Sequence, residues 1–222
     1  MKSILISIKP EWVVDILNGN KTVEIRKTMP KCELPCKVYI YCTKSNKYTC
    51  TINRSKSQLF RGYSENQIIF NGELCNGKVV AEFTLNKIDR LEFCHLGLSH
   101  TNAYVPTSEN ADYQWQKHSC VDYNKVVGYG KFAPLFVWHI DDLKIYDTPK
   151  ELSDFETAIH CFQYKNIQIT RNCFGDYVGD YYKNKFCHIC KYYNHDFEDC
   201  DKSRHSLTRP PQSWCYVDVS PC

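Results

Sequence analysis

Hydrophobic positions at the start of the chain predict a strand followed by a short helix. Isoleucines recur at every second position of residues 4–8, which is the period of a β-strand. Pro10 then favours a helix start, and Gly19 favours its end. The apolar positions between them fall on one helical stripe, formed by Trp12, Val13, Ile16 and Leu17.

A second strand is predicted over residues 21–26, where alternation buries Val23 and Ile25 and places Thr22, Glu24 and Arg26 on the other face. Residues 36–43, 78–86 and 135–146 are further strand candidates, rich in β-branched and aromatic residues. Thr107 or Ser108 is placed to cap a helix over residues 109–118. These patterns predict an α+β domain whose small, mostly antiparallel sheet closes into a β-barrel with short helices.

The distribution of cysteine and tyrosine suggests two parts. After Thr148 and Pro149 the chain becomes a Cys/Tyr-rich tail. We therefore predict a main domain over residues 1–147 and a C-terminal module over residues 148–222, with no internal repeat.

Composition then narrows the class of protein. No apolar run approaches the ~18 residues of a membrane span, and the N-terminus looks like a strand and unlike a signal peptide. We therefore expect a cytoplasmic, reducing environment. In that environment 14 cysteines in 222 residues indicate buried packing residues, a metal site or a catalytic thiol.

Charge is unevenly distributed along the chain. Residues 1–61 hold 12 Lys and Arg against 4 Asp and Glu, whereas the whole chain has a net charge of +3. Between residues 37 and 61 the cations alternate with aromatic residues, a composition suited to phosphates and stacked bases. The alternative is a solvated loop face with a few core tyrosines.

The segment from Gly19 to Arg26 carries the most distinctive chemistry. Lys21 offers a compact charge, and Arg26 offers a planar fork that suits phosphate or carboxylate. Glu24 lies between these cations and is positioned to orient them. The alternative is that Lys21, Glu24 and Arg26 form an ion-pair network that braces the fold.

These residues resemble the signature of the ASCH domain family, which has a PUA-like β-barrel. That signature has a Lys-Pro before a short helix, followed by Gly-x-Lys-Thr-x-Glu-x-Arg. The chain supplies Lys9-Pro10 and then Gly19, Lys21, Thr22, Glu24 and Arg26. The resemblance covers most of residues 1–147, and the whole chain resembles phage or mobile-element proteins of this kind.

The resemblance implies a basic cleft beside the barrel that accepts RNA or a modified nucleoside. Lys9, Trp12, Lys21, Thr22, Glu24 and Arg26 are the residues it places there. Trp12, Trp138 and His139 are candidate stacking residues on this cleft, with core packing as the alternative.

Two other functions stay open. Some bacterial members of the family hydrolyse N4-acetylcytidine, and the resemblance places their lysine on Lys21 and their glutamate on Glu82, with Glu24 at the position of their threonine. A nucleoside amidohydrolase or ribonuclease would then use Glu24 or Glu82 as general base and Lys21 to stabilise an oxyanion. The other alternative is a phage protein that captures a host factor or a nucleotide signal.

The tail contains a zinc-ligand spacing. Over residues 187–200 the chain has the C-x2-C-x4-H-x4-C pattern of a CCHC zinc knuckle, with Cys187, Cys190, His195 and Cys200 as ligands of Zn²⁺. His188, His205 or Cys215 are alternatives to His195. Nearby acidic residues repel phosphate, so we expect this zinc to be structural.

Overall fold

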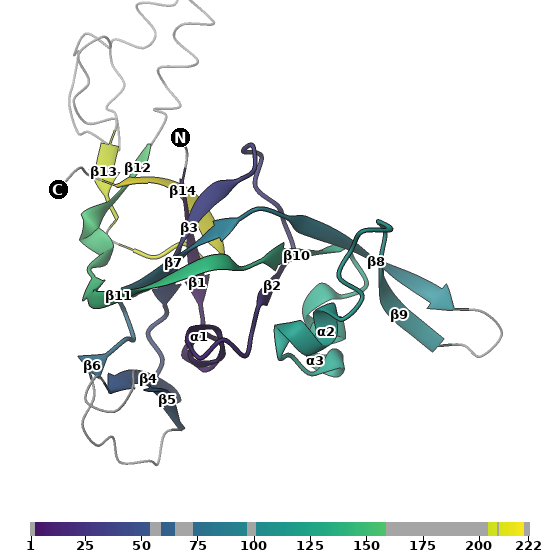
Figure 1. Cartoon of the computed structure of the whole chain (residues 1–222), viewed down its shortest axis with the longest axis horizontal. Coiled ribbons are helices and arrows are strands. Elements are labelled where there is room, and N and C mark those ends of the chain that lie inside the picture. Colours follow the sequence, from purple (N-terminus) through teal and green to yellow (C-terminus); the bar gives the residue numbers. More distant parts are fainter. Residues whose placement is uncertain are drawn as a thin grey trace, which may run out of the picture. The chain divides into compact units, whose positions relative to one another are not determined.

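The computed structural model describes residues 3–53, 59–64, 73–96, 101–158, 204–207 and 209–219 (Figure 1). Three α-helices occur among the described residues: α1 (Pro10–Leu17), α2 (Trp115–Ser119) and α3 (Tyr123–Gly130). The described strands are β1 (Ser3–Ile8), β2 (Val23–Arg26), β3 (Cys36–Cys42), β4 (Tyr48–Asn53), β5 (Leu59–Ser64), β6 (Glu73–Leu74), β7 (Val79–Leu85), β8 (Ile88–Leu96), β9 (Thr101–Pro106), β10 (Leu135–His139), β11 (Asp141–Lys150), β12 (Phe155–Ala158), β13 (Arg204–Ser206) and β14 (Trp214–Val219).

The chain divides into two compact units. The first consists of residues 1–152 and 208–216, and the second of residues 153–207 and 217–222. Within the second unit, β12 pairs antiparallel with β13 and, through Phe155 and Val219, with the end of β14. The main domain predicted from the sequence ends at residue 147, whereas the first unit also contains the later segment 208–216.

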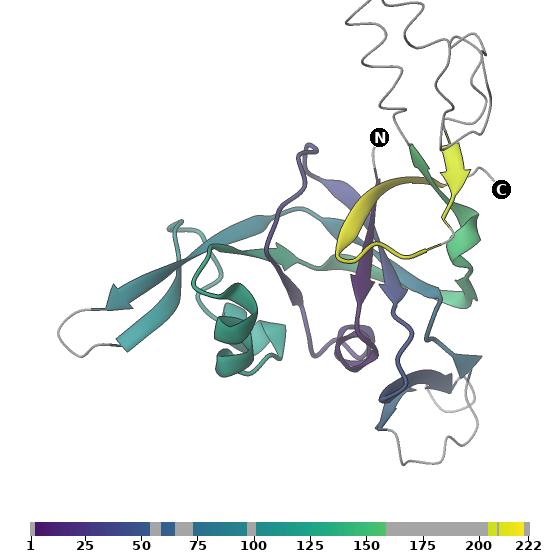
Figure 2. The same ribbon diagram turned by 180° about the vertical axis from the view of Figure 1, so that it is seen from behind.

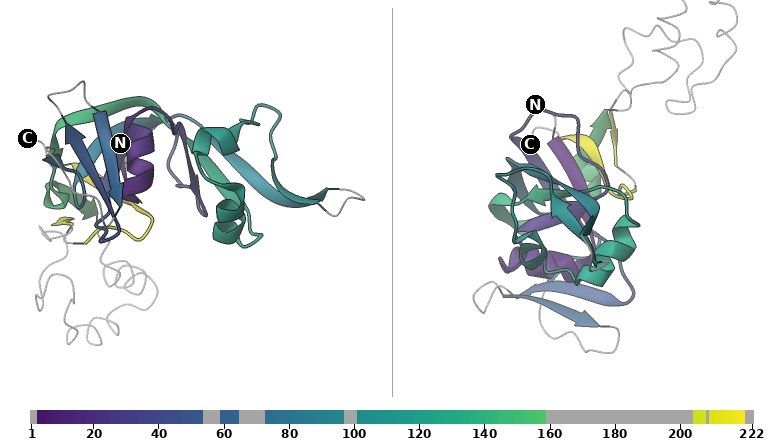
Figure 3. Two further views of the ribbon diagram at one scale, coloured as in Figure 1. Left: turned by 90° about the horizontal axis from the view of Figure 1, so that it is seen from below. Right: turned by 90° about the vertical axis from the view of Figure 1, so that its right-hand side faces the viewer.

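The first unit is a mixed α+β structure with mostly antiparallel pairing, as predicted. One sheet has the order β11-β7-β3-β1, with β14 beside β1, and of these strands β1 and β3 run parallel. A second sheet, β2-β10-β8-β9, is antiparallel throughout. In Figure 3 the β8–β9 hairpin extends beyond α2 and α3. A small third sheet has the order β5-β4-β6.

The expected closed barrel is not formed by the described strands, which make open sheets. One edge of β1 pairs with β3, and the other lies against the chain at residue 213, where the Ser7 amide donates to the Ser213 carbonyl at 2.9 Å. Both edges of β1 are therefore occupied, so β2 cannot join it through the backbone. A side chain makes the connection instead, because Arg26 Nη2 donates to the Ser7 carbonyl at 2.8 Å.

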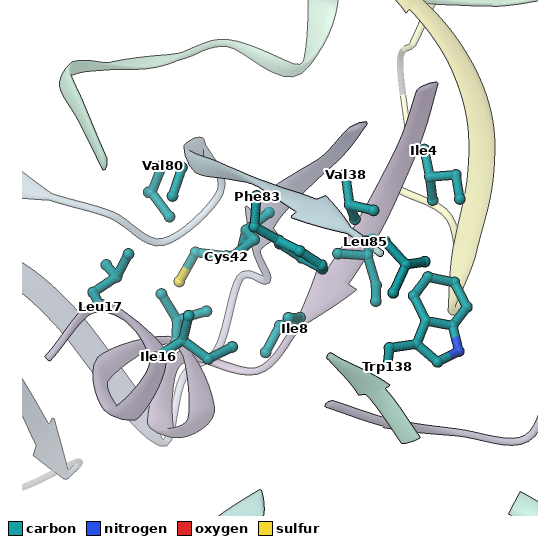
Figure 4. Packing of buried hydrophobic residues seen from close by; sticks show 14 of the residues in the cluster. Ile4, Ile8, Ile16, Leu17, Val38, Cys42, Val80, Phe83, Leu85 and Trp138 are labelled. Atoms are coloured by element: carbon teal, nitrogen blue, oxygen red, sulfur yellow. The ribbon is translucent and has the colours of Figure 1, made fainter. Parts of the chain in front are cut away.

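Two hydrophobic clusters fill the first unit. The larger packs α1 against β1, β3 and β7, and Figure 4 shows Ile16 and Leu17 of α1 on the same side as Cys42 and Val80. Trp138 of β10 is completely buried at one end of this cluster, beside Leu85. The smaller cluster joins β2, β10 and the helices α2 and α3, and it contains Val23, Ile25, Leu91, Tyr104, Trp115, Val126, Leu135 and Val137.

Several sequence-based elements are confirmed, one is divided and one is wrong. The strands at the N-terminus and at residues 36–43 and 78–86 are present, as is the helix from Pro10. The predicted strand over residues 135–146 is present as two strands, β10 and β11, divided at Ile140, whose amide donates to the Thr22 carbonyl. The predicted helix over residues 109–118 is wrong, because α2 begins only at Trp115. Before it, the Asp112 amide donates to the Asp89 carboxylate, which holds the chain in a turn.

No helix in the described part of the chain combines the length and apolar character needed to cross a membrane.

Candidate nucleic-acid interface

The candidate site is assembled where α1 turns into β2. Pro10 stands at the first position of α1, and the helix ends before Gly19, which has a φ of +76°. Such a backbone conformation is left-handed and costs glycine little, so Gly19 allows the sharp turn that follows the helix. The amides of Asn20 and Lys21 then donate to the Asp15 carbonyl, which sets the start of the next segment.

Lys21, Glu24 and Arg26 form a buried ion triad. Lys21 Nζ lies 3.2 Å from Glu24 Oε2, and Arg26 Nη2 lies 3.0 Å from Glu24 Oε1. All three residues are buried, with Lys21 only 2% exposed. Polar and apolar side chains therefore alternate along β2 as predicted, but the face that carries the polar side chains is buried as well. This arrangement agrees with the bracing ion-pair network that the sequence left open.

The outer ends of the triad are tied to the backbone. Lys21 Nζ donates to the Ser119 carbonyl at 2.7 Å, so the ammonium satisfies a carbonyl at the C-terminal end of α2. Arg26 donates to the Ser7 carbonyl and, through Nη1, to Ser213 Oγ at 3.3 Å. The triad thus links β2 to α2, to β1 and to residue 213.

Two aromatic side chains from different helices flank this triad. Trp12 of α1 is half-buried, and two ammonium groups lie near its ring: Lys21 Nζ at 5.8 Å and Lys125 Nζ at 5.7 Å from the centroid. Tyr129 of α3 is 40% exposed, with Lys27 Nζ at 4.8 Å from its ring centroid. These are cation–π distances.

The charges of Arg26 and Glu24 also affect the pKa of Tyr129. Burial raises the pKa of Tyr129, the positive charge of Arg26 lowers it, and the negative charge of Glu24 raises it. The net shift is upward, so the phenol stays protonated at neutral pH and its hydroxyl can donate a hydrogen bond. Trp12 therefore lies near Lys21 with Lys125 beside its ring, and Tyr129 lies close enough to Glu24 and Arg26 for their charges to act on its pKa. We call Trp12, Lys125, Tyr129 and Lys27, together with Glu24, the Trp12–Tyr129 face.

The remaining predicted binding residues lie in different settings. Lys9, immediately before α1, and Thr22, immediately before β2, are both exposed. Trp138 is completely buried and therefore belongs to the core, the alternative that the sequence left open. His139 is partly buried, and its Nε2 lies 2.7 Å from Asp89 Oδ2.

Glu82 belongs to a separate cluster on β7. Its Oε1 accepts from Lys37 Nζ at 3.0 Å, and its Oε2 accepts from the Tyr146 hydroxyl at 2.6 Å. Burial alone would raise the pKa of Glu82, but the bonds from Tyr146 and Lys37 outweigh it and lower the pKa. Glu82 thus has its own partners, while Glu24 is paired with Lys21 and Arg26. A catalytic role for Lys21, Glu24 and Glu82 stays a prediction.

The Cys120 thiol, which lies near Lys21, is not activated. Burial raises the pKa of Cys120, nearby Asp15 raises it further, and Lys21 opposes them. The thiol donates to the Asn20 carbonyl at 3.2 Å. Because a thiolate is the reactive form, Cys120 has no enhanced nucleophilicity in this setting.

Sequence reasoning missed several residues of this region. Tyr129, Lys125 and Ser119 lie about a hundred residues from the motif, and Ser213 lies 187 residues from Arg26. The Asp89 carboxylate, which bonds His139, Lys87 and the Asp112 amide, was also missed. No local pattern marks such residues, because only the folded chain brings them to the motif.

Asp89 gives a testable pH dependence. Burial would raise the pKa of Asp89, but its bonds from the Asp112 amide, His139 and Lys87 outweigh burial and lower it. A carboxyl with a lowered folded-state pKa stabilises the protein above its unfolded pKa of ~3.9, and this stability is lost as pH falls through the folded pKa. We expect Asp89→Asn to cost about 1.5–3 kcal/mol of unfolding free energy at pH 7.

Urea titrations from pH 7 down to pH 3 measure this effect. The loss of stability on acidification should be smaller in Asp89→Asn than in the parent protein, since the variant lacks the titrating group. The control, Asp142→Asn, changes an exposed carboxylate and should leave the pH profile unaltered. Parallel pH profiles for Asp89→Asn and the parent protein would contradict the assignment.

The predicted zinc ligands Cys187, Cys190, His195 and Cys200 lie outside the described residues. Among the described residues, no group of three or more His, Cys, Asp or Glu side chains is arranged to hold a metal ion. Burial raises the pKa of Cys215, one of the alternative ligands, to about 11. The zinc knuckle stays a prediction.

Comparison with known proteins gives matches among solved structures alone. No family model matches the chain. No curated protein matches it either. The crystal structure of ASCH from Zymomonas mobilis is similar over 98% of this chain and 88% of that chain, with 13% identity and a TM-score of 0.46.

Two mutants of the same protein are also similar. A serine-to-alanine mutant matches with 14% identity over 98% of this chain and 89% of that chain, with a TM-score of 0.46. A tyrosine-to-phenylalanine mutant matches with 15% identity over 68% of this chain and 77% of that chain, with a TM-score of 0.41.

Proposed function

We propose that the chain binds RNA or a modified nucleoside on the Trp12–Tyr129 face. The observation that carries this proposal is the pair of accessible aromatic rings, from α1 and α3, that flank the buried triad with exposed lysines beside them. Unpaired bases stack on aromatic side chains, and neighbouring lysines neutralise phosphates. Lys9 before α1 and Thr22 before β2 are also exposed, and they extend the polar surface available to a ligand backbone.

Glu24 gives this face a means of recognising a base edge. Each of its oxygens has one cationic partner, Lys21 or Arg26, and a carboxylate oxygen has room for a second hydrogen bond. A carboxylate accepts hydrogen bonds and does not donate them. Glu24 is only 7% exposed, so it accepts from a ring N–H or an exocyclic amino group where the base reaches the small accessible part of the carboxylate.

Binding without catalysis fits the described geometry better than hydrolysis does. A hydrolase needs a base that is free to take a proton from water. Glu24 has both oxygens paired with cations, and Glu82 is bonded to Lys37 and Tyr146. An amidohydrolase, a ribonuclease and a phage protein that captures a host factor stay alternative predictions, which turnover assays and pull-downs address.

Replacement of Trp12 by alanine is the direct test of this proposal. Loss of one base–aromatic stacking contact costs ~1–3 kcal/mol, so we expect Kd for a fluorescein-labelled six-nucleotide RNA to rise about tenfold. Fluorescence anisotropy at a fixed, low salt concentration measures the change. Lys125 shares the Trp12 ring, so salt dependence should also weaken in Lys125→Gln.

The matched control is Tyr113→Ala, which removes an aromatic ring that is 65% exposed and whose hydroxyl donates to the Ser108 carbonyl. It should leave Kd unchanged. Equal Kd values for the parent protein, Trp12→Ala and Tyr113→Ala would show that Trp12 does not stack on the ligand. Absence of any binding by the parent protein would overturn the proposed function itself.

A further inference from the structure

Residues 209–216 form an extended segment, here called the strap, that follows one edge of β1. The Ser7 amide donates to the Ser213 carbonyl at 2.9 Å, and Ser7 Oγ donates to the Pro211 carbonyl at 2.7 Å. Further along, Trp214 Nε1 donates to Thr28 Oγ1 at 3.0 Å. In Figure 2 the yellow strap crosses beside β1.

The strap lies on the polar face of β2 and β10. In the antiparallel register Glu24 is opposite Trp138, and Arg26 is opposite Phe136, so these four side chains share one face. The strap contacts two of them: Ser213 Oγ accepts from Arg26 Nη1, and the Trp214 ring lies 5.8 Å from the Trp138 ring. It therefore covers the side of the triad opposite to Lys21.

Two buried donors on this face have no partner. Among the buried side-chain nitrogen and oxygen atoms of the described residues, Arg26 Nε and Trp138 Nε1 make no hydrogen bond. The Arg26 side chain is 8% exposed, and Trp138 is 0% exposed. Buried donors are nearly always paired in folded proteins. Here both unpaired donors belong to residues that the strap contacts.

The strap itself does not supply the missing acceptor. Its carbonyls at Pro211 and Ser213 are both engaged by Ser7, and the Ser213 hydroxyl takes Arg26 Nη1. Pro210 and Pro211 lack amide hydrogens and restrict the backbone to extended conformations, so the strap loses little conformational freedom when it closes again. Residues 209–213 lie before β14 begins at Trp214, so this part of the strap, which lies over the unpaired donors, is the part suited to open and close.

We propose that Arg26 Nε and Trp138 Nε1 form a subsite for an oxygen acceptor of the ligand and that the strap is a displaceable cover over it. The acceptor is a base carbonyl or a phosphate oxygen, since either accepts from a guanidinium and an indole N–H. The inference rests on the proposed function, because it extends the same RNA or nucleoside site from the Trp12–Tyr129 face across Glu24 to Arg26. Ligand binding then competes with the closed strap.

Hydrogen exchange of the unmodified protein is the first test. The Ser7 amide is protected by its bond to the Ser213 carbonyl, so displacement of the strap should speed its exchange about tenfold at saturating six-nucleotide RNA. Uridine and inorganic phosphate, tested separately, distinguish the source of the acceptor: the probe that speeds exchange carries it. Unchanged or slower Ser7 exchange with saturating RNA would overturn the strap proposal.

The second test weakens the cover. The double variant Ser213→Ala/Trp214→Ala removes the contacts to Arg26 and Trp138, and we expect it to bind the same RNA about fivefold more tightly, because less binding free energy is spent on opening. Tyr113→Phe, outside the strap, is the control. It removes only the hydroxyl that donates to the Ser108 carbonyl and should leave Kd unchanged.

The two proposals fail in different ways. Trp12-dependent RNA binding with no effect of RNA on Ser7 exchange, and no gain of affinity in the double variant, overturns the strap and leaves the Trp12–Tyr129 face intact. If neither the parent protein nor the double variant binds RNA, the proposed function falls, and the strap proposal falls with it.

Discussion

Replacement of Glu24 by glutamine is expected to lower the free energy of unfolding by about 3–5 kcal/mol. The glutamate bridges Lys21 and Arg26 at 3.2 and 3.0 Å, and both cations are buried. A neutral amide of the same shape leaves two buried positive charges close together without a counter-ion. Urea denaturation followed by tryptophan fluorescence measures the loss, and the slope of the transition shows whether the variant still unfolds in one step.

Glu92→Gln is the matched control for this experiment. It makes the same chemical change at the exposed pair formed with Arg90, where the interaction is screened by solvent, and it should cost less than about 1 kcal/mol. A similar small cost for Glu24→Gln would mean that water or backbone groups replace the carboxylate, and the triad would then not stabilise the fold. Because Glu24 variants perturb folding, Trp12 is the better residue for testing binding.

Trp138→Ala is expected to destabilise the protein by a similar amount, about 3–5 kcal/mol. Its ring is completely buried between the β10 strand, the large hydrophobic cluster and the Trp214 ring. Truncation removes the apolar contacts and leaves a cavity at the end of the cluster that Figure 4 shows beside Leu85. The same urea experiment gives the magnitude.

Trp12→Ala makes the same truncation at a half-buried tryptophan on α1, and it should cost no more than about half as much. This comparison also checks that the Trp12 variant used for RNA binding stays folded. Equal costs at the two positions would show that Trp12 is a core residue and would weaken its role as a stacking surface.

The triad has a dual consequence for function. It stabilises the junction of β1, β2 and α2, and it fixes the carboxylate of Glu24 between Lys21 and Arg26. A rigid acceptor beside accessible rings is a suitable element for recognising a base edge, since little ordering is required on binding. Structural and binding roles of Lys21, Glu24 and Arg26 are therefore compatible.

The local elements of the N-terminal region were predictable from the sequence. The periodicity of residues 4–8, Pro10 and Gly19 locates β1 and α1, and the alternation after Lys21 places Val23 and Ile25 inside. These are properties of a few consecutive residues, so they do not depend on contacts with distant parts of the chain. The helix over residues 109–118 failed because Asp89, from a distant strand, binds the Asp112 amide and holds a turn there.

The sequence by itself determined that Lys21, Glu24 and Arg26 lie together at the entrance and on one face of a strand that follows a short helix. Only the tertiary structure decided that this face is buried, that Trp12 and Tyr129 flank it, and that Ser213 contacts Arg26. The physical reason is the distance along the sequence over which each property is set. Strand periodicity depends on neighbouring residues, whereas burial and pairing depend on which distant segment takes each free strand edge, and here residue 213 takes the edge of β1 that a closed barrel would need.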